Sequence, residues 1–417
     1  MYRLSVYILP IFRESRDSVR LETGMSRWRI KAVRCYVIET LGVGGNYASR
    51  APGHWIVDAR QANPMSVYPN RTDLRTGAGD AAAGILLEIE SADGTLGIAT
   101  GSGGIAACAI IEQGLAGLLV GSDPRDIARL WDQMYRATLP YGRKGIALMA
   151  VSVADLALWD LLGQLHGEPV YRLAGGATRD RIAVYGTGPD PTVFQRRGFV
   201  GGKVPFPYGP SDGRKGFAAN VRAVAAHREG VGPEFPLMID CFMSLDVPYA
   251  LEFAHAVKPY GLHWIEEALH PDDRDGYRQL KAAAPWVRWA TGEHEYTRWG
   301  FRDLVQQRTI DIIQPDLMWA GGFTEALRIA SVASAFDVTV VPHAGGIYSY
   351  HFAMTQPGIP FAEYCITSPK GNEITSVFGA MFEGEPLPLD GTITLSDAPG
   401  WGLKLRRDAV QLKRFAA

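Results

Sequence analysis

The spacing of hydrophobic and polar positions differs between the first and the second part of the chain. In its first part, residues 28–41 and 84–90 form apolar runs bounded by turn residues, which is the pattern of strands. Residues 106–135 and 146–165 instead place apolar side chains three and four positions apart, which predicts helices. A Gly- and Pro-bearing stretch, roughly 42–80, separates the two strands, and irregular loops of this length are usually functional lids or disordered. The first part therefore predicts a small α+β domain.

From residue 181 onward, short apolar runs alternate with helical stretches. One such stretch, Glu325–Phe336, follows Thr324, a residue type that favours the N-cap of a helix. Alternating strands and helices indicate a parallel sheet, and eight such units indicate a sheet that closes into a barrel. The strands are predicted to begin near Ile182, Phe199, Pro236, His263, Arg288, Ile310, Val338 and Phe361.

Length and rhythm together predict the domain organisation. A chain of 417 residues has room for one large domain of about 250 residues and a smaller one. The apolar run at 4–12 is too short to span a bilayer and no small-residue cleavage site follows it, so neither a membrane anchor nor a signal peptide is predicted. The predicted divisions are a weakly ordered extension at 1–27, an α+β domain at 28–150, a barrel at 151–385, and a tail at 386–417 that packs back on the α+β domain.

Composition narrows the possible partners. Hydrophobic residues make up 47% of the chain and charged residues 21%, as in ordinary globular proteins. The formal net charge of -2 gives no basic field, so nucleic acid is not an expected partner. A membrane is not expected either, because the apolar run at 4–12 is too short to span one. Four cysteines without a CxxC pair argue against a zinc knuckle or a disulfide framework and indicate the reducing cytoplasm. These cysteines are Cys35, Cys108, Cys241 and Cys365.

Five apolar runs in the barrel region each end in a residue suited to metal or proton chemistry. The runs end at Asp240, Glu266, Glu293, Asp316 and His343, at steps of 26, 27, 23 and 27 residues. Each step is about the length of one strand–helix unit. Since the functional residues of a barrel lie where its strands end, the spacing predicts a metal-assisted acid–base site at the barrel mouth.

The three carboxylates are the predicted metal ligands. A hard cation such as Mg²⁺ prefers oxygen donors, and Asp240, Glu266 and Glu293 would supply three of them from successive strands. No Cys or His joins them at zinc spacing, which lowers the zinc alternative. The alternative that each carboxylate only caps a helix or pairs with Lys or Arg is weaker for three at matched spacing than for one. Glu267 is expected to face away from the site, because neighbouring residues on a strand point to opposite sides.

His343 is the predicted general base. Its unperturbed pKa lies close to neutrality, so an imidazole near a metal is able to remove or return a proton. Asp316 ends the preceding strand and is expected to hydrogen-bond that imidazole and orient it. The alternative is a core histidine beside a helix-capping aspartate, and the three nearby carboxylates make it the weaker interpretation.

The same motifs carry a resemblance to a known family. The run ADLALWDLLGQLHGEPVYRLAGG at 154–176, followed by the five strand ends above, resembles the enolase superfamily and its mandelate-racemase subgroup. The similarity extends over almost the whole chain beyond residue 28 and is closest to the acid-sugar dehydratases of the rhamnonate type. The motifs shared with these dehydratases are GGKVP at 201–205, TGEHE at 291–295, IIQPD with a following WAGG at 312–322, VVPHAGG, and PFAEYCITSP at 360–369.

The resemblance implies a fold, a cofactor and a reaction. The fold is a (β/α)7β TIM-like barrel with an α+β capping domain built from the N-terminal part and the C-terminal tail. Mg²⁺ is the implied cofactor, and a His base working with Mg²⁺ is a property of the superfamily rather than a result of the spacing. Glu363, in the last strand, is implied to stabilise the enolate. A sugar acid is the implied substrate, and a homo-oligomer is the implied assembly.

Dehydration is the expected reaction. His343 would remove the proton next to the substrate carboxylate, the 3-hydroxyl would leave as water, and a 2-keto-3-deoxy acid would result. Protonated His343 is the first candidate for the acid that assists the leaving hydroxyl. His294 is a second candidate, and the alternative for His294 is a hydrogen bond that only supports its neighbour Glu293.

One missing lysine favours dehydration over racemisation. Many members of the subgroup carry Lys-x-Lys at the end of the second barrel strand, whereas this chain has Lys203, Val204 and Pro205. Racemisation needs a base on each face of the substrate, and dehydration needs only one. Lys203 itself either steers the substrate carboxylate or forms a salt bridge.

The sequence of the capping loop does not determine which sugar acid is the substrate. The rhamnonate pattern places a substrate-contacting His where this chain has Ala48. His54 lies six residues further and is a candidate replacement or an ordinary loop residue, and Arg75 is a second candidate substrate contact. The departure at Ala48 leaves another aldonate as an alternative substrate. The sequence is also compatible with an epimerase or racemase that uses His343 and His294 as opposed bases, and with a catalytically silent sugar-acid binder.

Overall fold

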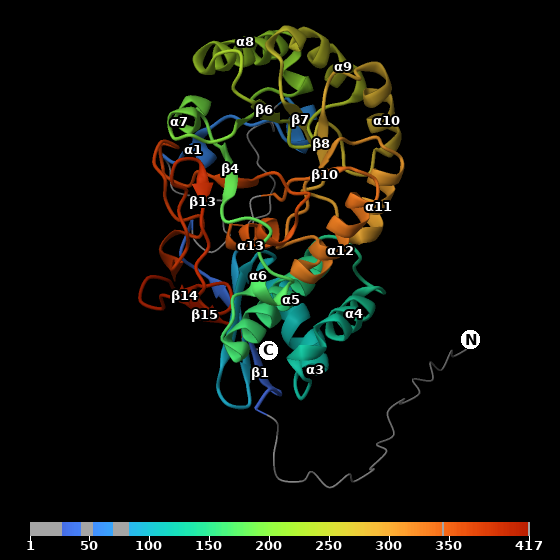
Figure 1. The fold of residues 1–417 in the computed structure, drawn as a ribbon. Helices are drawn as coiled ribbons and strands as arrows, with labels where there is room; N and C mark the ends of the chain where they lie inside the picture. Colours follow the sequence, from blue (N-terminus) through green and yellow to red (C-terminus); the bar gives the residue numbers. More distant parts are fainter. Residues whose placement is uncertain (1–26, 43–52, 70–82, 344–345, 416–417) are drawn as a thin grey trace, which may run out of the picture.

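A curled sheet of parallel strands forms the core of the upper part of the molecule (Figure 1). The structure is a computed structural model that describes residues 27–42, 53–69, 83–343 and 346–415. Hydrogen bonds join the parallel strands in the order β10-β9-β8-β7-β6-β5-β4-β11, so only β11 departs from chain order, by returning beside β4. The predicted parallel barrel is confirmed. Its strands are β4 (Ile182–Thr187), β5 (Gly202–Pro205), β6 (Leu237–Asp240), β7 (Trp264–Glu266), β8 (Trp289–Thr291), β9 (Ile312–Ile313), β10 (Thr339–Val340) and β11 (Ala362–Cys365).

Helices alternate with these strands and surround the sheet (Figure 1). The helix α10 presents an apolar stripe inward, with Tyr277 and Leu280 buried three positions apart, whereas every residue of α13 is buried. One helix follows each strand from β4 to β10, which gives the (β/α)7β order among the described residues. The helices are α7 (Pro191–Arg196), α8 (Gly213–Val231), α9 (Val247–Ala256), α10 (Arg274–Ala283), α11 (Thr297–Gln306), α12 (Gly322–Ser334) and α13 (Ile347–Thr355).

An antiparallel sheet in the order β15-β1-β2-β3 forms the second unit. Its edge strand β15 comes from the C-terminal tail and pairs with β1, so that Tyr36 lies opposite Arg414. The capping unit is therefore built from both ends of the chain. Its elements are β1 (Ile30–Ile38), α1 (Trp55–Asp58), β2 (Ile85–Ser91), β3 (Leu96–Gly101), α2 (Gly104–Ala109), α3 (Ala116–Leu119), α4 (Ile127–Thr138) and β15 (Leu412–Arg414).

Helix α5 (Ile146–His166) joins the two units, and α6 (Val170–Leu173) follows it. It is apolar all round, as expected for a helix buried on every side. Its composition and length would allow it to cross a membrane, but 89% of its apolar window is buried inside the protein. The predicted boundary between residues 150 and 151 falls inside α5, because the helix packs on β3 and on α12 at once.

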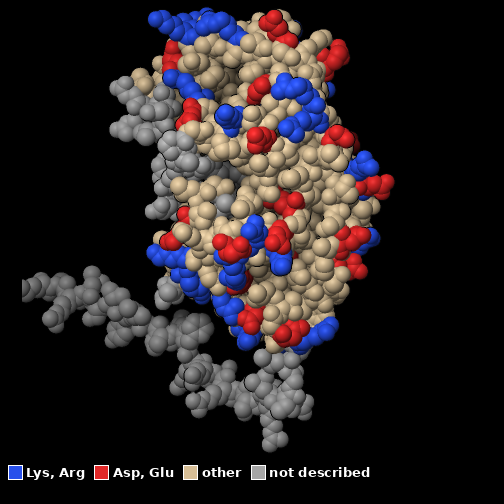
Figure 2. Space-filling view, turned by 90° about the vertical axis from the view of Figure 1, so that its left-hand side faces the viewer, with Lys and Arg blue, Asp and Glu red and all other residues tan. Residues whose placement is uncertain are grey.

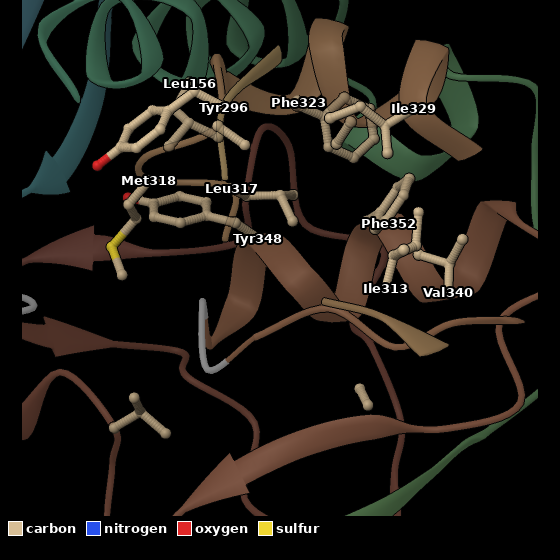
Figure 3. Packing of buried hydrophobic residues seen from close by; sticks show 14 of the residues in the cluster. Leu156, Tyr296, Ile313, Leu317, Met318, Phe323, Ile329, Val340, Tyr348 and Phe352 are labelled. Carbon is tan, nitrogen blue, oxygen red and sulfur yellow. The ribbon is translucent and has the colours of Figure 1, made fainter. Parts of the chain in front are cut away.

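A shared core connects α5 to the strand ends. In Figure 3, Leu156 of α5 lies close to Tyr296 and above Met318, a residue of the segment that follows β9. Leu317 and Met318 are almost fully buried. The segment that follows β9 therefore rests on α5 through tightly packed apolar side chains.

Other parts of the tail pack on the barrel. Strand β13 (Thr392–Ile393) pairs with β4, and β12 (Phe382–Glu383) pairs with β14 (Lys404–Leu405). On the face shown in Figure 2, acidic and basic side chains are interspersed without a large field of one sign. The predicted extension at 1–27, apart from Arg27, lies outside the described residues, as do Ala48 and Arg75.

Candidate active site

Three buried carboxylates meet at the C-terminal ends of neighbouring barrel strands. Asp240 ends β6 and Glu266 ends β7, and these two residues are direct partners in the strand register. Glu293 lies two residues beyond β8. Each of the three offers an oxygen, and these oxygens lie within 4.8 Å of one another. The even spacing in the sequence thus becomes one cluster in space.

Glu266 is held by donors from three strands or strand ends. Its Oε1 accepts a hydrogen bond from Lys203 Nζ of β5 at 2.5 Å. Its Oε2 accepts from Trp264 Nε1 at 2.9 Å and from Gln314 Nε2 at 2.7 Å. The orientation of this carboxylate is therefore fixed before any ligand arrives.

Burial keeps the cluster from ionising freely. It raises the pKa of Asp240 to about 6 and the pKa values of Glu266 and Glu293 to about 7. The charges of Lys203 and His343 act in the opposite direction, lowering these pKa values. Crowded oxygen donors that are short of positive charge fit a hard divalent cation, which would supply that charge.

A histidine–aspartate dyad stands beside the cluster. Nδ1 of His343 lies 2.8 Å from Asp316 Oδ2, and its Nε2 lies 3.3 Å from Glu293 Oε2. The other oxygen of Asp316 accepts from the backbone amide of Met318 at 2.7 Å, which fixes the carboxylate. Burial lowers the pKa of His343, but the charge of Glu293 and the bond to Asp316 outweigh it, so the pKa is well above its usual value. A cation bound by Glu293 would remove the largest of these raising effects.

A second imidazole–carboxylate pair lies on the other side of Glu293. Nδ1 of His294 is 2.7 Å from Glu267 Oε2, and its Nε2 is 3.8 Å from Glu293 Oε1. Burial lowers the pKa of His294, but Glu267 and Glu293 raise it to about 9 overall. The prediction that Glu267 faces away was wrong. Its φ of 42° ends the strand alternation, and its side chain turns to the same side as that of Glu266.

Glu363 of β11 completes the ring of charges. Its carboxylate lies 3.1 Å from Lys203 Nζ and accepts a hydrogen bond from the Thr187 hydroxyl. Burial raises the pKa of Glu363, but Lys203 and His343 outweigh it and lower the pKa to about 2. Lys203 is thus the bridge between Glu266 and Glu363, with 1% of its side chain exposed.

The candidate substrate contacts are placed differently from one another. Lys203 and His294 lie in the cluster, and Arg75 lies outside the described residues. Both ring nitrogens of His54 are engaged by the protein: Nε2 is 3.0 Å from the carbonyl oxygen of Thr367, and Nδ1 accepts from the Ile56 amide at 3.2 Å. His54 therefore joins the capping unit to the loop after β11 and offers a substrate neither nitrogen.

Two residues that the sequence interpretation did not select also line the site. Glu267 orients His294, and the signal available for it was the doubled acid of Glu266 and Glu267. Trp319 packs against both imidazoles, with ring centroids 5.2 Å from His294 and 6.1 Å from His343. Its only signal was its place in the WAGG motif.

Fold and site together define a class of protein. Three carboxylates lie at the strand ends beside the His343–Asp316 dyad, and a second unit built from both chain ends packs on the barrel. This is the arrangement of a barrel enzyme that moves protons next to a metal-held carboxylate. A family model described as enolase C-terminal domain-like matches residues 193–409. A second, described as mandelate racemase / muconate lactonizing enzyme, N-terminal domain, matches residues 58–175. The chain belongs to the enolase superfamily.

Solved structures agree with this placement. A structure of rhamnonate dehydratase from Gibberella zeae complexed with Mg is 48% identical, with a TM-score of 0.89 over 92% of this chain and 96% of that chain. A second structure of L-rhamnonate dehydratase from the same organism is 47% identical over the same shares, with a TM-score of 0.86. A racemase from Streptomyces coelicolor A3(2) with bound magnesium is 26% identical over 91% of this chain and 98% of that chain, with a TM-score of 0.73.

Proposed function

We propose that this protein is a Mg²⁺-dependent acid-sugar dehydratase that acts on L-rhamnonate. The observation that carries the proposal is the His343–Asp316 dyad, whose second ring nitrogen, Nε2, lies 3.3 Å from one of the three clustered carboxylates. A base at that position faces the carbon next to a carboxylate held by the cluster. The similarity to the Gibberella zeae dehydratase supports the substrate.

Asp240, Glu266 and Glu293 would hold the cation. Their oxygens are close enough to share one ion and are of the type that Mg²⁺ prefers. When bound, Mg²⁺ supplies positive charge beside the substrate carboxylate and so favours loss of the neighbouring proton. Lys203 adds a second positive charge next to Glu266.

His343 performs both proton transfers in the proposed reaction. Nε2 takes the proton from carbon 2, and Asp316 stabilises the imidazolium that forms. The electron pair left on carbon 2 expels the 3-hydroxyl, to whose oxygen His343 returns its proton, so that water leaves. The enol then becomes the 2-keto-3-deoxy acid. His294 is the second candidate for the acid in this step.

Glu363 contributes as a hydrogen-bond donor only when it carries a proton. Its pKa is lowered to about 2 in the free protein, so the carboxylate is ionised there. An approaching substrate carboxylate is a like charge, and like charges raise the pKa of a carboxyl group. We propose that Glu363 gains a proton on substrate binding and then donates to the anion that forms at the reacting carbons.

The test is a screen of the purified protein with Mg²⁺ against aldonic and aldaric acids, with detection of 2-keto-3-deoxy products. We expect the strongest product formation from L-rhamnonate. Product from another aldonate alone would retain the mechanism and change the substrate, as the Ala48 departure allows. Product from none of the acids would overturn the proposal and favour a silent sugar-acid binder.

The pair His294–Glu267 favours one alternative function. With two imidazole–carboxylate pairs flanking Glu293, proton exchange at opposite faces of a substrate carbon would give an epimerase or racemase. In heavy water, such an enzyme would return substrate that carries deuterium and the inverted configuration. A dehydratase would give the keto acid instead.

We also infer the cellular compartment and the oligomeric state of the protein. The thiols of its four cysteines are free, which supports the cytoplasm. The family resemblance supports a symmetric homo-oligomer. Light scattering coupled to size-exclusion chromatography tests the assembly, and a monomeric mass at micromolar concentration would contradict it.

A further inference from the structure

We propose that the indole N–H of Trp319 is a substrate-binding donor, which hydrogen-bonds an oxygen of the sugar acid close to the reacting carbons. The inference rests on the proposed function and adds a residue to it. Nε1 of Trp319 is buried and has no hydrogen-bond partner among the described residues. An indole nitrogen is a donor only, so it requires an acceptor that the described part of the chain does not supply.

The local backbone directs Trp319 to the site. Asp316 accepts from the Met318 amide through its side chain and from the Trp319 amide through its carbonyl oxygen, at 2.7 and 3.1 Å. This tight turn sends Leu317 and Met318 into the core, where both are almost fully buried (Figure 3). Trp319 is only partly buried, and its ring lies beside those of His294 and His343.

The indole lies against the two imidazoles that face the substrate. Its ring centroid is 5.2 Å from that of His294 and 6.1 Å from that of His343, with interplanar angles of 56° and 41°. His343 Nε2 in turn lies 3.3 Å from Glu293. A molecule held between these groups therefore has Trp319 as one wall.

The chemistry of the unpaired donor matches the proposed substrate. A buried N–H without an acceptor destabilises the folded protein, so such a group in an active site indicates a ligand that accepts from it. L-Rhamnonate carries a carboxylate at carbon 1 and hydroxyls on carbons 2 to 5, so an oxygen acceptor lies at or next to each reacting carbon. An analogue without an oxygen at that position would leave the donor unpaired and bind less well.

The experiment compares two substitutions that each remove an unpaired indole donor. Trp319→Phe keeps an aromatic ring at the site and loses the N–H. Trp289→Phe is the matched control, because Nε1 of Trp289 is also buried without a partner among the described residues but belongs to the start of β8, in the core. Both are assayed with Mg²⁺ and the aldonate on which the wild-type protein is most active, alongside thermal melting.

We expect Trp319→Phe to raise KM about tenfold and to leave kcat within about threefold, since a hydrogen bond made equally in ground and transition states affects binding alone. The control should keep the wild-type KM. A KM for Trp319→Phe within twofold of wild type would overturn the inference. If that variant melts far below wild type, benzothienylalanine at position 319 repeats the test, because it replaces the N–H by sulfur and preserves the ring shape.

The result separates the two proposals. Wild-type turnover of an aldonate is measured first, and its absence would refute the proposed function. With wild-type turnover established, an unchanged KM for the position-319 variants refutes only the role of Trp319.

Discussion

At the scale of single residues, turnover depends most on His343. Substituting it by Asn removes the group that accepts the proton, while Asn retains the ability to hydrogen-bond Asp316. We expect product formation to fall by about a thousandfold or more. Circular dichroism and Mg²⁺ titration should remain like those of wild type, because His343 is not among the three clustered ligands. Near-wild-type turnover would refute the assignment of the base.

Glu293 is the ligand that also touches both imidazoles. Glu293→Gln removes a charged oxygen from the cluster, so we expect Mg²⁺ affinity to fall by at least about tenfold in a calorimetric titration. Glu295→Gln is the control, since Glu295 is equally buried but pairs with Arg274 and Lys144. An unchanged titration of Glu293→Gln would remove Glu293 from the site.

The residue spacing was enough to predict the clustered carboxylates, but it did not predict the side-chain orientation of the residues next to them. Asp240, Glu266 and His343 could be predicted because a strand–helix unit has a nearly constant length, so strand ends recur evenly. Glu267 could not, because its orientation depends on a φ of 42° at the strand end rather than on alternation. For Lys203, the structure gives the salt bridge that the sequence left as one of two alternatives, with Glu266 and Glu363 as partners.

At the scale of elements, the linking helix α5 caps a helix of the barrel. Asp155 Oδ2 accepts from the Thr324 amide at 2.8 Å, at the start of α12. Asp155→Ala would leave that amide unpaired, so we expect the free energy of unfolding to fall by about 1–2 kcal/mol in urea. Asp155→Asn keeps an acceptor and should lose much less. Equal losses for the two variants would contradict a capping role.

The start of α12 is one point where the sequence interpretation of elements is wrong. The helix predicted to begin at Glu325 begins at Gly322 instead, with Gly321 as its N-cap at a φ of 124°. Thr324 does not cap the helix: its hydroxyl accepts from Trp159, and its amide is satisfied by Asp155. A cap supplied by another helix leaves no local signal, because the two residues are 169 positions apart.

At the scale of the whole molecule, the sequence predicted the barrel. It did not predict the joints, by which we mean the side-chain contacts that tie the capping sheet and the C-terminal tail to α5 and to the helices of the barrel. Alternation of strands and helices runs from Ile182 to Cys365, so local errors do not obscure it. The joints depend on single side chains. Asp160 accepts from the amides of Ile98 and Trp401, which ties β3 and the tail to α5 across 62 and 241 positions. Pairs so distant follow no period, so the strand and turn signals of the tail predicted that it packs back but not which residues hold it.

The same joint makes stability depend on pH through His351. This side chain of α13 accepts from the Tyr171 amide at 3.1 Å and packs edge-on against Trp401, at 5.1 Å between centroids. Burial lowers its pKa from 6.5 to about 3. Between these two pH values the unfolded chain binds a proton at this position and the folded chain does not, so His351 makes stability fall as the pH falls.

His351→Gln isolates this effect, because an amide side chain is able to accept from Tyr171 and does not titrate. In urea unfolding with saturating Mg²⁺, the stability advantage of wild type over the variant should be largest above pH 6.5. This advantage should decrease by up to about 1.4 kcal/mol per pH unit toward pH 3. Taking the difference between wild type and variant cancels the pH effects that are common to both proteins. An advantage that stays constant from pH 7 to pH 4 would show that His351 takes up its proton equally well in the folded state, and the joint would then contribute nothing to acid sensitivity.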